Sequence, residues 1–439
     1  MKKVMVCGCG AQGSTIIRKL DEEPNIVEIV CADYNFEAAK AVASRIKKGT
    51  PKQVDATKVE EIVKAAEGCE LIVNVMPLEI GGYVLEAAMQ AKCCYQDLSA
   101  CKMELPGVSY YDEWFQGIVH QRTVFSPRFE ANNTTAVIGT GSAPGVMCVM
   151  ARRAVQELDE CETIMTFVYE GGRCRNRFLP FWWSKDVALG DMEDDAYAFE
   201  NCKQIRTKGF GRPVERNWEE VGRPAVLVEH SHDEPVYFGM NREKYFKGVK
   251  NAYFKYGGTG IEFAYQLKKA NLISREDETF KGATFNPHQW VLSHIPNAPK
   301  DPDEIQAILD EGIIEDNGAF VVEAYGKKDG KDVMVDLHVS APSCADAFAR
   351  SQMTGEMYLT GQGAFLFTKL FVNDMMPEKG LLSSDMLNDE QVAQYLKWAE
   401  ELDITYTIDI KEGVKWSPEM AGEDDVECWP IMMMEHKKK

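Results

Sequence analysis

The first 100 residues alternate between short apolar runs of strand length and segments whose apolar residues recur at helical spacing. The predicted strands are 3–7, 27–32, 71–75 and 93–98, and the predicted helices are 14–20, 36–46, 59–66 and 84–91. Leu71–Val75 is continuously apolar, as expected for a strand buried on both faces. Strands and helices that alternate at this pace predict right-handed βαβ units and a parallel sheet.

The pattern changes near residue 140. The next predicted elements are a strand at 137–140, a helix at 146–158 and a strand at 163–169. The stretch 173–300 is aromatic, loop-rich and short of clean helical patterns. Two runs that alternate at period two, 319–325 and 333–340, flank a lysine-rich glycine turn and predict a β-hairpin. We therefore expect an antiparallel sheet in an α+β domain, followed by helices at 345–371 and 386–402 and a tail from 416.

The turn after the first strand carries the clearest chemical signal. Its fingerprint is Gly8-x-Gly10-x-x-Gly13, with Ala11 and Gln12 between the last two glycines. It follows a strand and opens a helix, which is the context in which such a turn binds the pyrophosphate of a dinucleotide.

Two further positions complete this predicted dinucleotide site. Asp33 ends the second strand, where a carboxylate hydrogen-bonds a ribose 2′-hydroxyl, and no basic residue follows it to receive a 2′-phosphate. We therefore predict NAD rather than NADP. Asn74, Met76 and Pro77 end the third predicted strand and are expected at the nicotinamide side of the same crevice.

Charge and composition exclude several classes of function. The 439 residues carry 49 basic and 69 acidic side chains, a formal charge of −20, which disfavours nucleic acid or a membrane surface as a partner. No apolar run approaches the roughly 20 residues that span a bilayer, and the N-terminus lacks a signal-peptide pattern. The 13 cysteines do not form a disulfide framework. These features predict a cytoplasmic enzyme, and the seven histidines form no zinc motif, so no metal is predicted.

An ordered set of motifs resembles the saccharopine dehydrogenase / saccharopine reductase family. Besides the glycine fingerprint, the matching segments are 74–77, 95–99, 141–145, 169–172, 183–184, 241–242, 254–258, 354–355 and 379–382. The resemblance implies a Rossmann domain, 1–140, completed by a C-terminal segment at about 345–390. It also implies an inserted α+β domain for substrate binding and dimerisation, 141–344, then a C-terminal helix and tail, 391–439. A homodimer is expected on the same ground.

The resemblance further implies reversible hydride transfer at the CH–NH group of an amino-acid-type secondary amine. We predict that Asp97 and Tyr256 are catalytic, Tyr256 by positioning or protonating the substrate nitrogen. The predicted substrate-binding residues are Ser99, Arg173, Arg175, Arg242 and Lys255. Arginine suits substrate carboxylates because its guanidinium forms a bidentate fork, although these arginines could instead pair with nearby acids.

The sequence leaves three hypotheses open. The first is a saccharopine-like substrate. The second keeps the fold but takes a carboxylated polyamine or a lysine ε-amine, since Ala143 and the segment 173–177 depart from the family pattern near the expected substrate cleft. The third is a non-catalytic NAD(H)-binding sensor or scaffold, because a fold does not fix a function.

Overall fold

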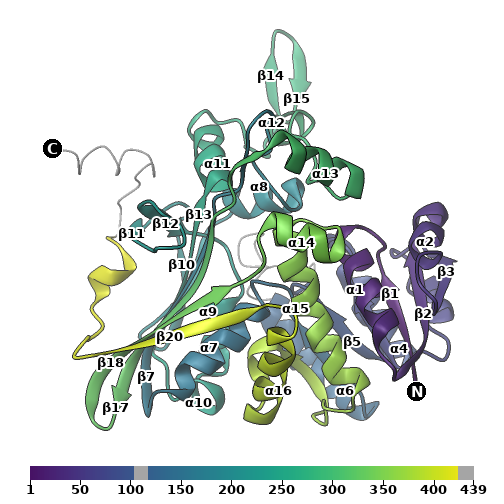
Figure 1. The fold of residues 1–439 in the computed structure, drawn as a ribbon, viewed down its shortest axis with the longest axis horizontal. Helices are drawn as coiled ribbons and strands as arrows, with labels where there is room; N and C mark the ends of the chain where they lie inside the picture. The colour runs from purple at the N-terminus through teal and green to yellow at the C-terminus, as the bar shows by residue number, and fades with distance from the viewer. Residues whose placement is uncertain (103–116, 424–439) are drawn as a thin grey trace. The chain divides into compact units, whose positions relative to one another are not determined.

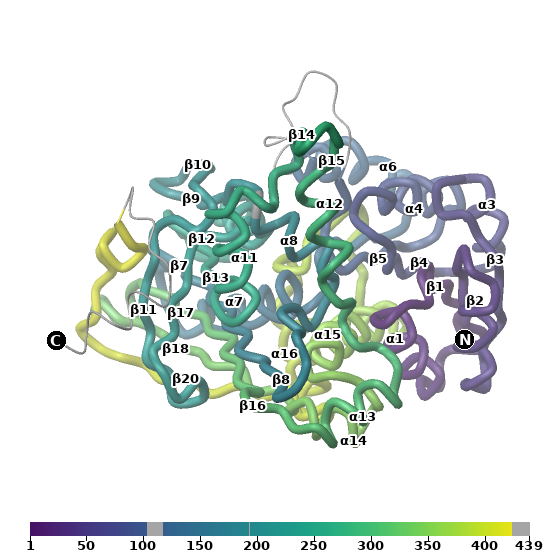
Figure 2. Tube along the Cα trace, turned by 90° about the horizontal axis from the view of Figure 1, so that it is seen from above, coloured from purple at the N-terminus to yellow at the C-terminus, as the bar shows by residue number. Residues whose placement is uncertain are grey.

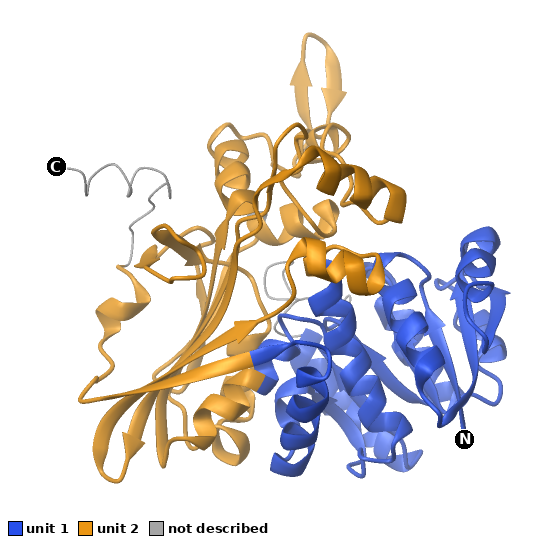
Figure 3. Cartoon of the chain, in the orientation of Figure 1, with its two compact units in different colours: residues 1–149, 357–405 blue, residues 150–356, 406–439 orange. Residues whose placement is uncertain are grey.

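The computed structural model describes residues 1–102 and 117–423 of the chain, and its elements are labelled in Figure 1. The chain forms two compact units (Figure 3). Unit 1 contains residues 1–149 and 357–405, and unit 2 contains residues 150–356 and the chain from 406 onward. None of the described helices combines the length and the apolar character that crossing a membrane requires.

Unit 1 is built on a parallel sheet with the strand order β19-β6-β5-β4-β1-β2-β3. Its strands are β1 (Lys2–Cys7), β2 (Ile26–Asp33), β3 (Gly49–Gln53), β4 (Leu71–Asn74), β5 (Cys94–Asp97), β6 (Thr135–Ile138) and β19 (Gly380–Ser383). The part from β3 to β6 has the strand order of a dinucleotide-binding Rossmann fold. The predicted α/β class, with a C-terminal strand added to the N-terminal sheet, is confirmed.

Helices cover both faces of this sheet. In Figure 2, α1 and α15 lie on one face and α4 and α6 on the other. The helices of this part are α1 (Ala11–Glu22), α2 (Phe36–Ala43), α3 (Val59–Ala65), α4 (Leu78–Ala91), η1 (Gln121–Phe125), α6 (Ser126–Ala131), α15 (Gly355–Val372), η2 (Ser384–Met386) and α16 (Asp389–Glu400). Because the central strands are covered on both sides, Val6, Val30 and Val73 are fully buried.

Two features of unit 1 differ from the sequence prediction. Helix α1 begins at Ala11 rather than Ser14, so the last part of the glycine fingerprint already belongs to the helix. Strand β3 was not predicted, because its sequence, Gly-Thr-Pro-Lys-Gln, is short and polar. It is the edge strand of the sheet, and only an edge position tolerates a proline in this way.

Unit 2 is built on a mixed sheet in which β10, β9, β13, β7, β17, β18 and β20 follow one another and β12 joins β11 to β13. The central pair β13–β7 is parallel, and β17 is antiparallel to both β7 and β18. Its strands are β7 (Glu160–Glu170), β9 (Ala196–Glu200), β10 (Lys203–Thr207), β11 (Val214–Arg216), β12 (Ala225–Glu229), β13 (Asn251–Gly258), β17 (Gly318–Lys328), β18 (Lys331–Ser340) and β20 (Thr405–Glu412). The predicted hairpin is confirmed as β17 and β18, joined by a turn at Asp329-Gly330, where both residues have positive φ.

The loop-rich stretch of unit 2 contains more helix than the sequence pattern indicated. The helices of this unit are α8 (Lys185–Glu193), α9 (Glu234–Met240), α10 (Arg242–Tyr245), α11 (Thr259–Lys269), α12 (Pro287–Leu292), α13 (Pro302–Glu311), α14 (Cys344–Ser351) and η3 (Pro418–Ala421), while α7 (Val146–Gln156) spans the boundary between the units. Two small antiparallel pairs complete the unit: β14 (Glu278–Phe280) with β15 (Ala283–Phe285), and β8 (Arg173–Cys174) with β16 (Ile313–Glu315). Most of these helices are shorter than three turns, which is why they leave little periodic signal.

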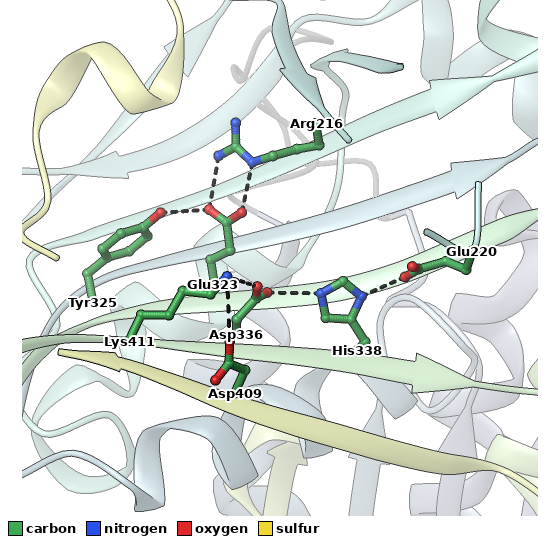
Figure 4. Close-up of polar contacts among 8 residues, drawn as sticks. All are labelled: Arg216, Glu220, Glu323, Tyr325, Asp336, His338, Asp409 and Lys411. Atoms are coloured by element: carbon green, nitrogen blue, oxygen red, sulfur yellow. Dashed lines mark hydrogen bonds and ion pairs between the residues drawn. The ribbon is translucent and has the colours of Figure 1, made fainter. Parts of the chain in front are cut away.

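A polar network ties β20 and β11 to the hairpin (Figure 4). Lys411 of β20 contacts Asp336 of β18 at 2.7 Å, and His338 bridges Asp336 to Glu220. Arg216 of β11 binds Glu323 of β17 through two hydrogen bonds of 2.7 and 2.9 Å. The segment between the last predicted helix and the tail thus contributes a strand, which sequence analysis did not assign although Tyr406, Ile408 and Ile410 alternate with polar residues.

Candidate functional site

The glycine fingerprint forms a tight turn between β1 and α1. Gly8 has φ +108°, and a Cβ on it would lie 2.9 Å from the carbonyl oxygen of Val75. A Cβ on Gly13 would lie 1.8 Å from the carbonyl oxygen of Gly8. Both positions therefore require glycine for the packing of the chain itself.

Gly10 has a different role. A Cβ on Gly10 would meet no atom within 4 Å, so the packing of the chain does not require glycine there. Gly10 precedes α1, whose first turn has neither an acidic residue nor a side-chain cap. Its free N–H groups and open space suit a diphosphate. The buried Oε1 of Gln12 also has no hydrogen-bond partner among the described residues. These residues fit a nicotinamide dinucleotide.

Asp33 is held against this turn. Its Oδ2 accepts a hydrogen bond of 2.8 Å from the N–H of Cys9, and its Oδ1 accepts one of 2.8 Å from the N–H of Asn35. Gln53 of β3 is its cross-strand neighbour, and Tyr34 beside it is 69% exposed. The immediate neighbours of Asp33 in the chain and across the strand pair are therefore uncharged.

The ends of β4 and β5 are joined by a buried hydrogen-bond chain. Asn74 donates to the hydroxyl of Tyr95 at 2.8 Å, and that hydroxyl donates to Asp97 at 2.9 Å. The other carboxylate oxygen of Asp97 accepts the N–H of Gly139 at 2.8 Å. Asp97 is only 2% exposed. Both oxygens of its carboxylate thus accept hydrogen bonds within unit 1, and the catalytic role of Asp97 stays a prediction.

The other predicted residues of unit 1 lie around the same strand ends. The N–H of Met76 donates to the side chain of Asn74 at 3.1 Å, which fixes the turn after β4. Pro77 precedes the first turn of α4. Ser99 is half-buried in the bend after β5. Carboxyl ends of parallel strands share one edge of a sheet, so the predicted cofactor residues lie at the edge where ligands of this fold bind.

In unit 2 the predicted arginine patch is largely neutralised. Arg173 lies 3.3 Å from Glu315, and Arg177 binds Glu311 through two nitrogens at 2.6 and 2.9 Å. Pairing with nearby acids, the alternative that the sequence left open, is therefore what the structure shows for these two. Arg175 is exposed and makes no ion pair among the described residues.

Two further predicted cations serve the fold. Lys255 is fully buried, 2.8 Å from the carboxylate of Glu229, and also donates to two backbone carbonyl groups. Arg242 donates to the carbonyl oxygens of Val249 and Gly248, at 2.9 and 3.3 Å, and pairs with Glu243. The three donors of Lys255 are engaged within the chain, whereas the five N–H donors of Arg242 exceed these three contacts. Their predicted role in binding substrate carboxylates stays a prediction.

Tyr256 lies in a cluster with Glu170, Trp183 and Glu356, and sequence analysis did not predict that these residues meet. Its hydroxyl donates to Glu170, which ends β7, and Glu170 also hydrogen-bonds Trp183 and Glu356. Burial, followed by the charge of Glu356, raises the pKa of Glu170 well above its ordinary value. The pKa of Tyr256 is also raised, by burial and then by Glu170, so this hydroxyl stays protonated and acts as a donor.

Two histidines lie beside this cluster. The ring of His230 contacts that of Tyr256 edge-on, with 4.9 Å between centroids. His230 is 3% exposed, and burial keeps its pKa well below the ordinary value, so it is neutral. His232 stacks on Phe254 at 3.7 Å and hydrogen-bonds Glu234. Glu170 lies in the segment 169–172, which resembles the saccharopine dehydrogenase family. Glu356 could not be linked to it from the sequence, because it lies in α15, far away in the chain.

The sequence of this chain resembles one protein family and two characterised relatives. Residues 4–137 match the family model described as "Saccharopine dehydrogenase NADP binding domain". Carboxynorspermidine synthase from Vibrio cholerae serotype O1 is 23% identical over 88% of this chain and 92% of its own length. Carboxyaminopropylagmatine dehydrogenase from Synechocystis sp. is 26% identical over 67% of this chain and 73% of its own length.

A solved structure shares the fold of both units. It is apo saccharopine dehydrogenase (L-Glu forming) from Saccharomyces cerevisiae, with a TM-score of 0.63 and 14% identity. The match covers 94% of this chain and 100% of the other. At this identity the likeness concerns the fold.

Proposed function

Because this chain is a saccharopine dehydrogenase-like NAD(P) oxidoreductase, we propose that it acts on the CH–NH group of an amino-acid-type secondary amine. The amine gives a hydride from carbon and a proton from nitrogen and becomes an imine, and the reverse direction reduces the imine. The nicotinamide cofactor, when bound, accepts or supplies the hydride. The glycine turn of unit 1 carries the proposal, because Gly10 is open while Asp33 is fixed beside it.

The proposed cofactor is NAD(H) rather than NADP(H). Each oxygen of the Asp33 carboxylate already accepts one backbone N–H and keeps a second lone pair for a ribose hydroxyl. A 2′-phosphate would meet this negative charge with the uncharged Gln53 and Tyr34 beside it. Repulsion without a compensating cation disfavours the phosphorylated cofactor.

A saccharopine-like amine is the first candidate substrate. A carboxylated polyamine is the second, and a specific observation favours it: Arg173 is paired with an acid, while Lys255 and Arg242 are used by the fold. Unit 2 therefore offers fewer cations for a substrate with several carboxylates than the sequence indicated. The relatives from Vibrio cholerae and Synechocystis are both named for carboxylated amines, which supports the same class.

We propose roles for the remaining predicted residues as follows. Arg175 is the candidate for a substrate carboxylate, because it is exposed and makes no ion pair among residues 1–102 and 117–423. Ser99 stays a candidate contact for substrate at the end of β5. Tyr256 contacts substrate through the acceptor lone pairs of its hydroxyl rather than as an acid, since its proton is donated to Glu170 and its raised pKa keeps that proton on the hydroxyl.

We also propose a cytoplasmic homodimer. The free thiols of the described cysteines suit a reducing compartment. Light scattering on the purified chain should give about twice the 49.4 kDa of one chain. A monomeric mass would refute the dimer and leave the chemistry unaffected.

The experiment that tests the function is an NADH absorbance assay on the purified full-length protein. Saccharopine, carboxylated spermidines, lysine and simple N-alkyl amino acids are each offered with NAD⁺ and with NADP⁺. We expect turnover of a carboxylated secondary amine, with NAD⁺ preferred. NADH binding without turnover of any such amine would overturn the proposal and favour a non-catalytic sensor.

A further inference from the structure

The hairpin of β14 and β15 has no partner strand elsewhere in the described part of the chain. Its two strands pair with each other over three residues each, and they join neither large sheet. Figure 1 shows the hairpin projecting beyond α12 of the same unit. A lone two-stranded hairpin is only marginally stable in water, so this one gains from a further contact. We call residues 276–285 the arm.

One face of the arm is apolar and open. Phe280, Ala283 and Phe285 lie on this face, with Glu278 at its end, because opposed residues and every second residue of a strand share a face. Phe280 is 64% exposed, the highest fraction among the large apolar side chains in the described part of unit 2. The arm therefore exposes apolar surface that association with another strand would remove from water.

The charges of the arm are separated between its base and its tip. Residues 276–278 are all acidic and exposed, and Lys281 stands in the turn at the other end. Asp277 and Glu278 accept hydrogen bonds only from asparagine side chains, and Lys281 lies over the ring of Phe280. Two arms that run in opposite directions would bring the lysine of each tip to the acidic base of the other. The arm is thus complementary in charge to a copy of itself.

We propose that the arm binds the arm of a second copy of this chain, with the two β14 strands side by side and antiparallel about a two-fold axis at Thr279. Lys281 then stands opposite the partner's Asp277 on both sides of the axis, because each lies two positions from Thr279. A two-fold contact of this kind is closed, and it covers the open edge of β14. The inference rests on the proposed homodimer and specifies one contact of its interface.

Sedimentation of the full-length protein over a range of concentrations measures how much the arm contributes. A stable homodimer buries on the order of 1,200 Å² or more, and two three-residue strands are too small to do so alone. We therefore expect Phe280→Asp to raise the dissociation constant of the dimer about tenfold or more, rather than to abolish the dimer. The matched control is Phe178→Asp, because Phe178 is 59% exposed outside the arm. It should leave the constant unchanged.

A charge exchange tests the orientation of the two arms. Lys281→Glu places like charges opposite each other in the proposed register, so we expect the dissociation constant to rise severalfold. Adding Asp277→Lys to the same chain re-forms both pairs with their signs exchanged, and it should restore most of the lost affinity. Failure of the double variant to recover affinity lost in Lys281→Glu would overturn the antiparallel register.

A cysteine pair tests the register directly. In the proposed contact, Thr279→Cys places two thiols across the axis, with about 5.5 Å between their Cα atoms, a separation that a disulfide spans. Thr284→Cys is the matched control, since Thr284 lies opposite Thr279 on the same face of the arm. Its copies would be three strand spacings apart, about 14 Å. Under copper phenanthroline, only Thr279→Cys should cross-link above the level of the unaltered chain, which retains the exposed Cys202.

The outcomes separate the arm contact from the proposed dimer and from the proposed chemistry. A dimer that is equally strong in Phe280→Asp and Phe178→Asp would overturn the arm contact and leave the homodimer standing. Cross-linking of Thr284→Cys in place of Thr279→Cys would also overturn it. The NADH dissociation constant is the folding check for each variant, and if Phe280→Asp fails this check, the cross-linking result decides. Neither result alters the oxidation assay that tests the proposed function.

Discussion

Asp33 accepts a 2.8 Å hydrogen bond from the backbone N–H of Cys9, so the residue that ends β2 holds the glycine turn that follows β1. The same carboxylate is the one expected to meet the ribose of a dinucleotide. Its internal hydrogen bonds therefore orient it before the cofactor arrives, which lowers the cost of ordering on binding.

Replacing Asp33 with asparagine is expected to reduce NAD(H) affinity about tenfold or more, because a hydrogen bond to a charged group contributes about 1.5–3 kcal/mol. The affinity for NADP(H) should fall less or rise, since the repelled charge is gone. Fluorescence titration with both cofactors measures this. Asp55→Asn is the control, because Asp55 is a carboxylate of unit 1 that pairs with Lys58. An unchanged ratio of the two affinities would contradict the assignment of Asp33.

The glycines of the fingerprint should separate into two classes. Gly13→Ala places a methyl group 1.8 Å from a carbonyl oxygen and is expected to destabilise unit 1 by about 1–3 kcal/mol or more. Gly10→Ala meets no atom within 4 Å and should leave the melting temperature nearly unchanged while weakening NADH binding. Thermal unfolding and NADH titration of the two variants check this. Equal loss of stability in both would show that Gly10 is also a packing residue.

Lys255 should behave as a structural residue. Lys255→Met leaves the buried carboxylate of Glu229 without its cation, and we expect a loss of about 3–5 kcal/mol of stability. The double variant with Glu229→Gln should recover much of this loss, because no unpaired charge then remains. Chemical denaturation of both variants measures the difference. A stable Lys255→Met protein with a raised KM for carboxylated substrates would restore the substrate-binding role.

His338 should make stability depend on pH in the alkaline range. Its hydrogen bond with Asp336, followed by that with Glu220, raises its pKa from 6.5 to about 9. Because folding raises this pKa, the protonated imidazole stabilises the folded state. That stabilisation is fully present below the pKa of the histidine in the unfolded chain and is lost as the pH rises through about 9. Melting temperatures from pH 6 to pH 10 should therefore fall more steeply than in His338→Gln. Parallel curves for the two proteins would contradict this.

Much of unit 1 could be predicted from the sequence, because the residues that determine its elements lie close together in the chain. The spacing of Gly8, Gly10 and Gly13 and the position of Asp33 lie within one βαβ unit, where apolar periodicity fixes strand, turn and helix. The short polar strand β3 was not predicted because an edge strand needs no apolar pattern.

By itself the sequence determined the α/β class, the dinucleotide turn and the family resemblance, since each depends on residues close together in the chain. Only the tertiary structure shows which charged side chains are paired with other groups of the protein. Arg173 is paired with Glu315, and Lys255 is buried against Glu229. Glu170 instead meets Tyr256 and Glu356. These partners are distant in the chain, so no local pattern records them. Whether a side chain binds a ligand or the protein depends on the burial and pairing that only the folded chain provides.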